Sequence, residues 1–345
     1  MMSRTRPGGS ARAPAGRQAG GPPPLAGPTG KRWPCAERRS AWLTLCAFRW
    51  TSGRSSTLDP MSRIRFEVVR DAEEFAARAY AFLAAKIERN VLATVLLNVL
   101  NGPFATGAPL FATGVDDRDE VQAAALRTPP WPLLATGIDL SNADELLSVW
   151  LLEDSEPPGV TGEPVTARAI AGAWANRTGG RTRRRMREAM HMLEEVTDPP
   201  RPARGALRAA EPSERQTLAD WMRAFALEAG VLGGEQADQI VDAQLARESL
   251  VVWDDNGCVS MVSLSPTVAG VTRFGPVYTP PEHRRRGYAS SAVAAASRRA
   301  LARGARSCAL FTDLANPTSN KIYAGVGYRR FADWEEHAFE RTATR

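Results

Sequence analysis

One short stretch of this chain has the composition of an anion-binding turn: Arg284, Arg285, Arg286 and Gly287. The apolar, β-prone run 271–278 precedes the turn and ends at two prolines, which have no N–H to donate to a sheet. Apolar residues at helical spacing follow over 288–303, up to Gly304. We therefore expect the turn at a helix N-terminus, where unpaired N–H groups, the helix dipole and guanidinium donors would hold a pyrophosphate. For these four residues alone, a solvated arginine run at the start of a surface helix is the alternative interpretation.

A second group of residues follows the helix. The run 307–312 (Ser-Cys-Ala-Leu-Phe-Thr) is typical of a buried strand. Asn316 is expected to cap a short helix whose first residue is Pro317. This helix carries Tyr323 and stops at Gly327. The predicted order over 271–328 is thus strand, basic turn, helix, strand and short helix.

In this order the two groups resemble the acyl-CoA-binding core of the GNAT superfamily of N-acetyltransferases. The stretch from Arg284 to Ala289 matches the family signature Gln/Arg-x-x-Gly-x-Gly/Ala. The stretch from Asn316 to Tyr323 (Asn-Pro-x-Ser-Asn-x-Ile-Tyr), followed by Gly327 and Tyr328, matches its second block. The resemblance is specific over roughly 206–339 and weak before that.

The resemblance implies a mixed α/β fold whose central, mostly antiparallel sheet is flanked by helices. It also implies acetyl-CoA as acyl donor, with the pantetheine arm along the end of the strand 271–278 and the pyrophosphate at the basic turn. The cofactor-binding residues that it implies are Val277, Tyr278, Thr279, Arg284, Arg285, Arg286, Gly287, Tyr288, Ala289, Asn316 and Asn320.

Tyr323 is the one catalytic residue that the resemblance implies, because a tyrosine at this position faces the CoA sulfur in the family. Its hydroxyl would protonate the thiolate that departs when an amine attacks the thioester directly in a ternary complex. A ring that packs in the helix while its hydroxyl reaches water is the structural alternative. No base is evident: Glu228 and Asp313 lie near the expected cleft, but each is interpreted as a solvated or capping carboxylate. A chain of water molecules is another route for the proton.

Two classes of function remain open. The first is an acetyltransferase that acts on a primary amine of a small molecule or protein. The second is a non-catalytic acyl-CoA-binding sensor. The presence of both motif blocks favours the enzyme, while the absence of an evident base keeps the sensor in consideration. The acceptor, the acyl-chain preference and the oligomeric state do not follow from the sequence.

The first half of the foldable region repeats the order of elements expected in the second: strand, two helices, three strands and a helix. The sequence therefore predicts two GNAT-like domains, at 61–200 and 206–345, joined through a proline-rich linker. The first half's counterpart of the basic turn is expected at 159–164 (Gly-Val-Thr-Gly-Glu-Pro), where an acid would repel phosphate. The first domain is thus expected to be a degenerate partner that shapes the acceptor cleft. The arginines of 181–187 could bind an anion, but a solvated face of a strand or helix is the commoner explanation.

Charge is unevenly distributed along the chain. Residues 1–60 carry ten Lys and Arg residues against two acidic ones, so with a net charge of +6 for the whole chain the remainder carries −2. Nucleic-acid binding is therefore not required. The Gly-, Pro-, Ala- and Arg-rich segment 1–60 is expected to be a disordered tail, with an over-extended reading frame whose start is Met61, or a transit peptide, as alternatives.

Cysteine and histidine usage points to a reducing compartment and to no structural metal. The four cysteines form no Cys-x-x-Cys pair, and the three histidines show no metal-ligand spacing. The apolar run 41–48 is too short to span a bilayer. The sequence thus predicts a soluble cytoplasmic protein.

Overall fold

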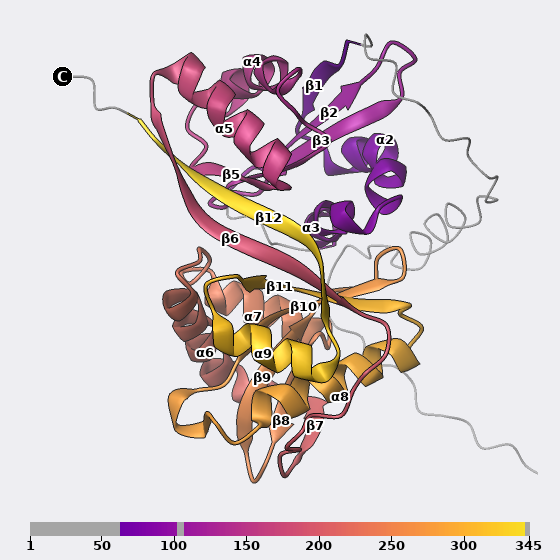
Figure 1. Cartoon of the computed structure of the whole chain (residues 1–345), viewed down its shortest axis with the longest axis vertical. Helices are drawn as coiled ribbons and strands as arrows, with labels where there is room; N and C mark the ends of the chain where they lie inside the picture. The colour runs from indigo at the N-terminus through magenta and orange to yellow at the C-terminus, as the bar shows by residue number, and fades with distance from the viewer. Residues whose placement is uncertain (1–62, 102–106, 342–345) are drawn as a thin grey trace, which may run out of the picture. The chain divides into compact units, whose positions relative to one another are not determined.

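The computed structural model describes residues 63–101 and 107–341 (Figure 1). All of them belong to the compact unit that spans 59–345. The predicted tail, the apolar run 41–48 and two of the four cysteines, Cys35 and Cys46, lie outside the described residues.

The elements of this unit occur in the same order in two halves. The first half contains β1 (Arg65–Val69), α2 (Ala72–Ala84), α3 (Asn90–Leu100), β2 (Leu110–Val115), β3 (Val121–Arg127), β4 (Leu133–Thr136), α4 (Ala143–Glu153), β5 (Gly159–Gly162), α5 (Pro164–Thr178) and β6 (Arg181–Leu193). The second half contains β7 (Ala206–Ala209), α6 (Arg215–Ala229), α7 (Ala237–Ala246), β8 (Leu250–Asp254), β9 (Cys258–Leu264), β10 (Val271–Tyr278), α8 (Tyr288–Ala302), β11 (Ser307–Asp313), α9 (Pro317–Val326) and β12 (Arg329–Glu340). Short 3-10 helices are η1 (Ile87–Arg89), η2 (Pro212–Glu214) and η3 (Pro281–His283).

The strands form one sheet in the order β1-β2-β3-β4-β5-β12-β6-β11-β10-β9-β8-β7. Only the β4–β5 and β10–β11 pairings are parallel among the strands of the described ranges. The predicted mixed α/β fold with a mostly antiparallel sheet is therefore confirmed.

The last strand of each half pairs with the other half. β12 lies between β5 and β6, and its Glu335 pairs with Gly162 of β5. β6 in turn lies against β11, where Glu188 pairs with Asp313. Figure 1 shows β6 and β12 as two long neighbouring strands. Each half of the sheet is thus completed by a strand from the other half. The division into two domains, at 61–200 and 206–345, stays a prediction.

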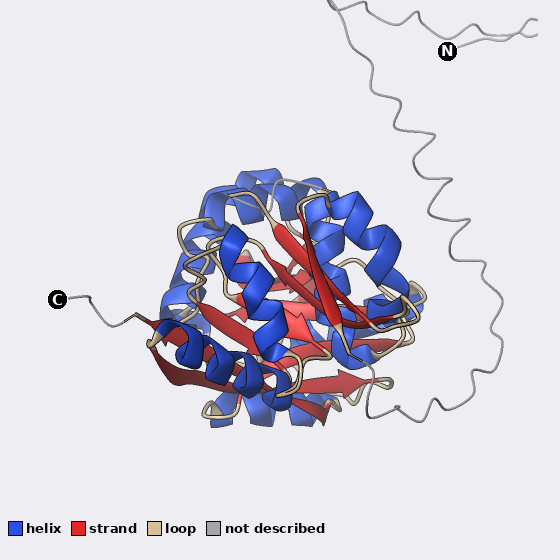
Figure 2. Cartoon of the chain, turned by 90° about the horizontal axis from the view of Figure 1, so that it is seen from above, coloured by secondary structure: helices blue, strands red, loops and turns tan. Residues whose placement is uncertain are grey.

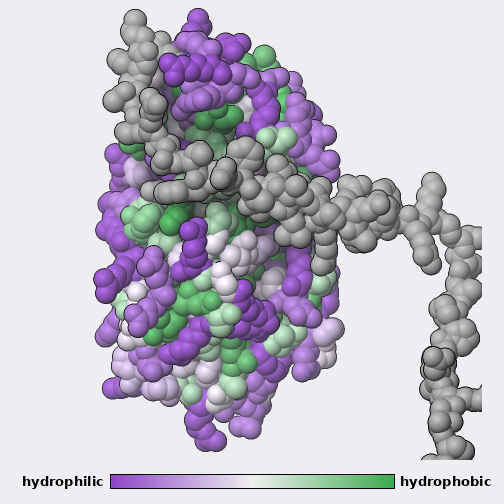
Figure 3. All heavy atoms as spheres, turned by 90° about the vertical axis from the view of Figure 1, so that its right-hand side faces the viewer, coloured by the Kyte–Doolittle hydropathy of each residue, from purple (hydrophilic) through white to green (hydrophobic). Residues whose placement is uncertain are grey.

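Helices pack on both faces of the sheet in each half (Figure 2). In the first half, α4 and α5 cover one face through Trp150 and Trp174, whereas α2 and α3 cover the other through Phe75 and Leu92. In the second half, α8 and α9 cover one face and α6 and α7 the other. Hydrophilic and hydrophobic side chains are interspersed on the face drawn in Figure 3. Among the helices of 63–101 and 107–341, none combines the length and the apolar character needed to cross a membrane.

Candidate active site

Strands β10 and β11 separate before β10 ends. Their parallel pairing runs from Val271–Ser307 to Phe274–Leu310, whereas β10 stays paired with β9 as far as Tyr278. A shift of register between Phe274 and Val277 marks the point of separation, which we call the fork. Beyond the fork, the edge of β10 that faces away from β9 is open to pairing with an extended ligand arm. In the first half, by contrast, β4 and β5 stay paired to within one residue of the end of β4.

The three residues predicted to contact the pantetheine arm lie beyond the fork. Val277 and Tyr278 end β10, and Thr279 follows them. The Ser260 hydroxyl donates to the carbonyl oxygen of Tyr278 over 3.1 Å, and the Arg284 Nε donates to that of Thr279 over 2.8 Å. Ligand pairing at these two residues would therefore use their other backbone groups.

The basic turn lies at a helix N-terminus, as the sequence predicts. Gly287 is the N-cap of α8, with a φ of 84°, and the three arginine side chains before it are exposed. Arg284 is held by the protein, because its guanidinium lies 2.7 Å from the carboxylate of Glu228, which also accepts from the Tyr278 hydroxyl over 3.0 Å. Arg285 and Arg286 form no ion pair within the described residues, although Arg286 interacts with the Tyr288 hydroxyl, so both can contact a phosphate.

The linker between the halves passes close to this turn. A Cβ placed on Gly287 would lie 2.7 Å from the carbonyl oxygen of Arg201, and the N–H of Ala203 donates to the Ser291 hydroxyl over 2.8 Å. Any larger residue at 287 would therefore be strained, both by the positive φ and by this contact with the linker. Substitutions at the arginines are therefore the cleaner probes of phosphate binding.

Two residues of the predicted cofactor set have side chains that serve the local structure. The Tyr288 hydroxyl donates to Asp255 over 2.6 Å, and the Asn316 side chain caps α9 by accepting from the N–H of Ser319 over 3.1 Å. Tyr288 and Ala289 lie in the first turn of α8, so their N–H groups are the ones that the helix itself does not pair.

Asn320 provides a test of whether the site fits an acyl-CoA. Its Nδ2 donates to the carbonyl oxygen of Asp313 over 3.3 Å, but its Oδ1 is buried and has no hydrogen-bond partner. An unpaired buried acceptor is costly, so the oxygen fits an N–H of a ligand. The amide groups of a pantetheine arm supply such donors.

Tyr323 lies on the α8–α9 side of the sheet near the fork. Its ring centroid is 6.1 Å from that of Tyr328, whose ring is 6.4 Å from that of Phe274, the last residue of β10 paired with β11. Burial raises the pKa of Tyr323 to about 12, so its hydroxyl keeps its proton at neutral pH.

A cavity of about 360 Å³ on the opposite face of the sheet extends to the fork. Successive strand residues point to opposite faces, and Arg273 and Phe311, which line the cavity, flank the last pair Phe274–Leu310. The other apolar lining residues are Val91, Val95, Val99, Leu126, Trp131, Pro132, Leu134 and Trp334. The other polar ones are Asn98, Thr128, Thr161, Glu188 and Glu336. Both halves thus contribute to this cavity.

Glu188 is the cavity's candidate base. Burial, reinforced by the negative charge of Glu336, raises the pKa of the Glu188 carboxyl to about 7, although the positive charge of Arg273 opposes the shift. A carboxyl with this pKa exchanges its proton readily near neutral pH. The sequence interpretation missed Glu188 because it is the only acid in the arginine-rich strand β6.

The two carboxylates considered from the sequence have structural partners. Glu228 is engaged by Arg284 and Tyr278, as described above. Asp313 accepts from the N–H of Ala315 over 2.8 Å, in a capping arrangement at the end of β11. Glu228 is thus held in an ion pair, and Asp313 has a capping role.

The prediction that residues 159–164 are the first half's counterpart of the basic turn is wrong. Residues 159–162 form β5, and Glu163 precedes α5, the counterpart of α9. The helix that follows β4 is α4, so the counterpart of the basic turn is 137–142. This segment also lacks arginine, and its Asp139 accepts from the N–H of Ser141 over 2.8 Å.

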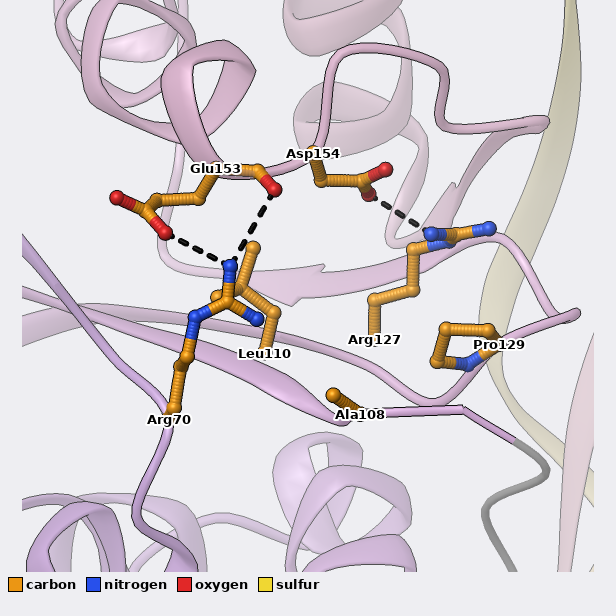
Figure 4. A pocket seen from close by; sticks show the side chains of 7 residues that line it. All are labelled: Arg70, Ala108, Leu110, Arg127, Pro129, Glu153 and Asp154. Atoms are coloured by element: carbon orange, nitrogen blue, oxygen red, sulfur yellow. Dashed lines mark hydrogen bonds and ion pairs between the residues drawn. The ribbon is translucent and has the colours of Figure 1, made fainter.

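A smaller cavity of about 160 Å³ lies within the first half (Figure 4). Its two cations are neutralised: Arg70 lies 2.8 Å from Glu153, and Arg127 lies 2.9 Å from Asp154. Because these charges are already paired, the fork is the stronger candidate for the active site.

Comparisons with known proteins agree with the fold. Residues 216–328 match the model of the Acetyltransferase (GNAT) family. Among solved structures, an acetyltransferase from the GNAT family of Colwellia psychrerythraea has a TM-score of 0.51 at 12% identity and covers 81% of this chain and 100% of its own. A GCN5-related N-acetyltransferase from Sphaerobacter thermophilus has a TM-score of 0.51 at 17% identity, with 81% and 97% covered.

A tandem GNAT protein from the clavulanic acid biosynthesis pathway also has a TM-score of 0.51, at 12% identity, with 82% of this chain and 100% of its own covered. At these identities the similarity shows the fold, and the tandem protein matches the repeated order of elements. No curated protein matches this chain in sequence.

Proposed function

We propose that this chain, whose residues 216–328 form a domain of the GNAT acetyltransferase family, transfers the acetyl group of acetyl-CoA to a primary amine. The observation that carries the proposal is the pair of groups at the fork. Glu188, with a pKa of about 7, lines the cavity on one face of the sheet, and the protonated Tyr323 lies on the other. Acyl transfer from a thioester to an amine needs a proton acceptor on the amine side and a donor on the sulfur side.

In the proposed reaction, Arg285, Arg286 and the N-terminus of α8 bind the pyrophosphate, and residues 275–279 hold the pantetheine arm. The amine enters the cavity as an ammonium ion and loses one proton to the Glu188 carboxylate. The neutral nitrogen then bonds to the thioester carbonyl carbon, the carbon–sulfur bond breaks, the electron pair leaves with the sulfur, and the nitrogen gives its second proton to solvent. Holding both reactants at the fork supplies the favourable orientation that such a direct attack requires.

The Tyr323 hydroxyl stabilises the departing thiolate chiefly by hydrogen bonding. Transfer of a proton from a group of pKa about 12 to a thiolate whose conjugate acid has a pKa of roughly 8.5 is unfavourable by about 5 kcal/mol. The proton is therefore shared in the transition state, and solvent completes the protonation after the bond breaks.

The protein is proposed to act in the cytoplasm. Its two described cysteines, Cys258 and Cys308, are free thiols, and burial raises the pKa of each to about 12. Unreactive free thiols are usual in a reducing compartment. Acetyl-CoA and the amine are the only partners that this function requires.

Acetyl-CoA turnover with a panel of primary amines tests the proposal. We expect release of free CoA thiol together with a product heavier by one acetyl group. The double variant R285E/R286E is expected to weaken acetyl-CoA binding at least tenfold, because it reverses two charges beside the phosphates. Arg303→Glu, at the other end of α8, is the matched control.

Calorimetric binding of acetyl-CoA without turnover on any amine would support the sensor instead. Absence of binding would exclude both functions.

Tyr323→Phe is expected to lower turnover by about 100-fold and to leave the dissociation constant of acetyl-CoA unchanged. The phenyl ring keeps the packing against Tyr328, so only the interaction with the sulfur is lost. Tyr328→Phe serves as control, because its hydroxyl interacts with Ser297 within the core. Steady-state kinetics and calorimetry on both variants make the measurement. Normal turnover in Tyr323→Phe would assign the tyrosine a purely structural role.

A further inference from the structure

Arg273 is a largely buried cation that forms no ion pair with any residue described by the structure. Within 63–101 and 107–341, its guanidinium has no carboxylate within 4 Å, and its Nε is buried without a hydrogen-bond partner. Its Cζ lies 5.3 Å from the ring centroid of Phe311. Burial lowers the pKa of Arg273 to about 10, which still leaves it charged at neutral pH. A buried cation of this kind is costly unless an anion pairs with it.

Three of the other polar side chains of the cavity have protein partners. Glu336 is paired with Arg185, Asn98 accepts from Arg247 over 3.2 Å, and Thr161 accepts from the Trp334 indole N–H over 2.8 Å. In the part of the chain that the structure describes, Glu188 and Arg273 are the charged groups that line the cavity without such a partner. The cavity thus offers one carboxylate and one guanidinium within mostly apolar walls.

We propose that the acceptor is an α-amino acid with an apolar side chain. Its carboxylate binds the guanidinium of Arg273, its amino group faces Glu188, and its side chain lies against the apolar walls formed by α3, Trp131 and Trp334. This inference rests on the proposed function, because it takes the cavity at the fork as the acceptor site. The cavity of about 360 Å³ lies within the size range of small-molecule sites.

A bound amino acid would explain why the cavity contains a carboxylate and a guanidinium that do not pair with each other. Glu188 and Arg273 influence each other electrostatically but form no ion pair within 4 Å. A zwitterion bridges such a pair, since its positive and negative groups each meet an opposite charge. An amine without a carboxylate would leave Arg273 buried and unpaired, which penalises its binding.

Calorimetric titration with three groups of probe compounds tests the proposal. The probes are L-phenylalanine, L-leucine and L-tryptophan; phenethylamine, which lacks the carboxylate; and 3-phenylpropanoate, which lacks the amino group. The titrations are made at pH 8 with coenzyme A present, which has no acyl group to transfer. At least one of the amino acids is expected to bind, and L-phenylalanine is expected to bind at least tenfold more tightly than either of its truncated analogues.

Arg273→Met keeps an unbranched side chain and removes the charge. In this variant the preference for L-phenylalanine over phenethylamine is expected to fall to about one. Arg299→Met is the matched control, since Arg299 is a half-buried arginine on α8 outside the cavity, and there the preference is expected to persist. Circular dichroism establishes that each variant is folded.

The wild-type comparison decides the matter even if Arg273→Met does not fold. Equal binding of L-phenylalanine and phenethylamine, or no binding of any of the three amino acids, would overturn the proposal. Binding that depends on the carboxylate, combined with a failure of acetyl-CoA turnover, would uphold the amino-acid site and contradict the transferase function. The two failures are therefore distinguishable.

Discussion

Glu188→Gln is expected to lower kcat/KM for acetyl transfer by about 100- to 10,000-fold, the usual contribution of a positioned acid or base. The amide keeps the size of the side chain but cannot accept the amine proton. The dissociation constant of acetyl-CoA should not change, because Glu188 lies on the face of the sheet opposite Tyr323. Steady-state kinetics and calorimetry on the wild type and the variant provide the measurement.

The pH profile of the wild type gives an independent readout of the same residue. Because the base acts deprotonated, kcat/KM is expected to rise with pH and to level off above about pH 7. Three charged groups face Glu188: Arg273 on β10, Asp313 on β11 and Glu336 on β12. Glu336→Gln removes a negative charge, lowers the pKa of Glu188 and should move the profile to lower pH. A profile unchanged in Glu336→Gln, or a Glu188→Gln variant of normal activity, would assign the base elsewhere.

Glu335→Gln is expected to reduce the free energy of unfolding at pH 7 by about 3 kcal/mol. Glu335 lies on β12 and is almost fully buried, and the guanidinium of Arg168 on α5 donates to both of its oxygens, over 2.6 and 2.9 Å. This pair and the nearby His337 lower the pKa of Glu335 to about 2 from a reference of 4.5. The pair therefore fastens the last strand of the second half to a helix of the first.

The sign of the pH dependence follows from this lowered pKa. The stabilisation by Glu335 is fully present above about pH 4.5 and is lost as the pH falls towards about 2. Urea unfolding at a series of pH values should thus show wild type and Glu335→Gln converging in this window. Glu340→Gln, which alters an exposed carboxylate of β12 beside Arg183, is the control and is expected to change stability by less than about 1 kcal/mol. A difference that persists at pH 2 would contradict the assignment.

Local sequence signals predicted the second half well. Gly287 before α8 and Asn316 before α9 mark the helix starts, because the conformation of a cap depends on a few neighbouring residues. The first half is less predictable: β5 has only four residues, two of them glycine, so its sequence predicts a turn. For this reason the counterpart of the basic turn was predicted at 159–164, whereas the structure has it at 137–142.

The base could not be predicted, because its environment depends on pairing between distant strands. Glu188 has its raised pKa only because β6 lies between β11 and β12, next to Asp313 and Glu336. No local pattern in the arginine-rich run 181–187 indicates which strands will flank it. The motif residues likewise indicate the fold better than the chemistry, since the side chains of Tyr288 and Asn316 are taken up by local hydrogen bonds.

Because β6 and β12 each pair with strands of the other half, the sheet cannot be completed until late in synthesis. β5 and β6 leave the ribosome well before β12, which follows more than a hundred residues later. At ordinary elongation rates this delay is on the order of ten seconds, for most of which one edge of β5 and both edges of β6 lack a partner, because β6 is flanked by β11 and β12. Unpaired strand edges promote pairing with other chains. The nascent first half therefore exposes these unpaired strand edges until β12 has been synthesised.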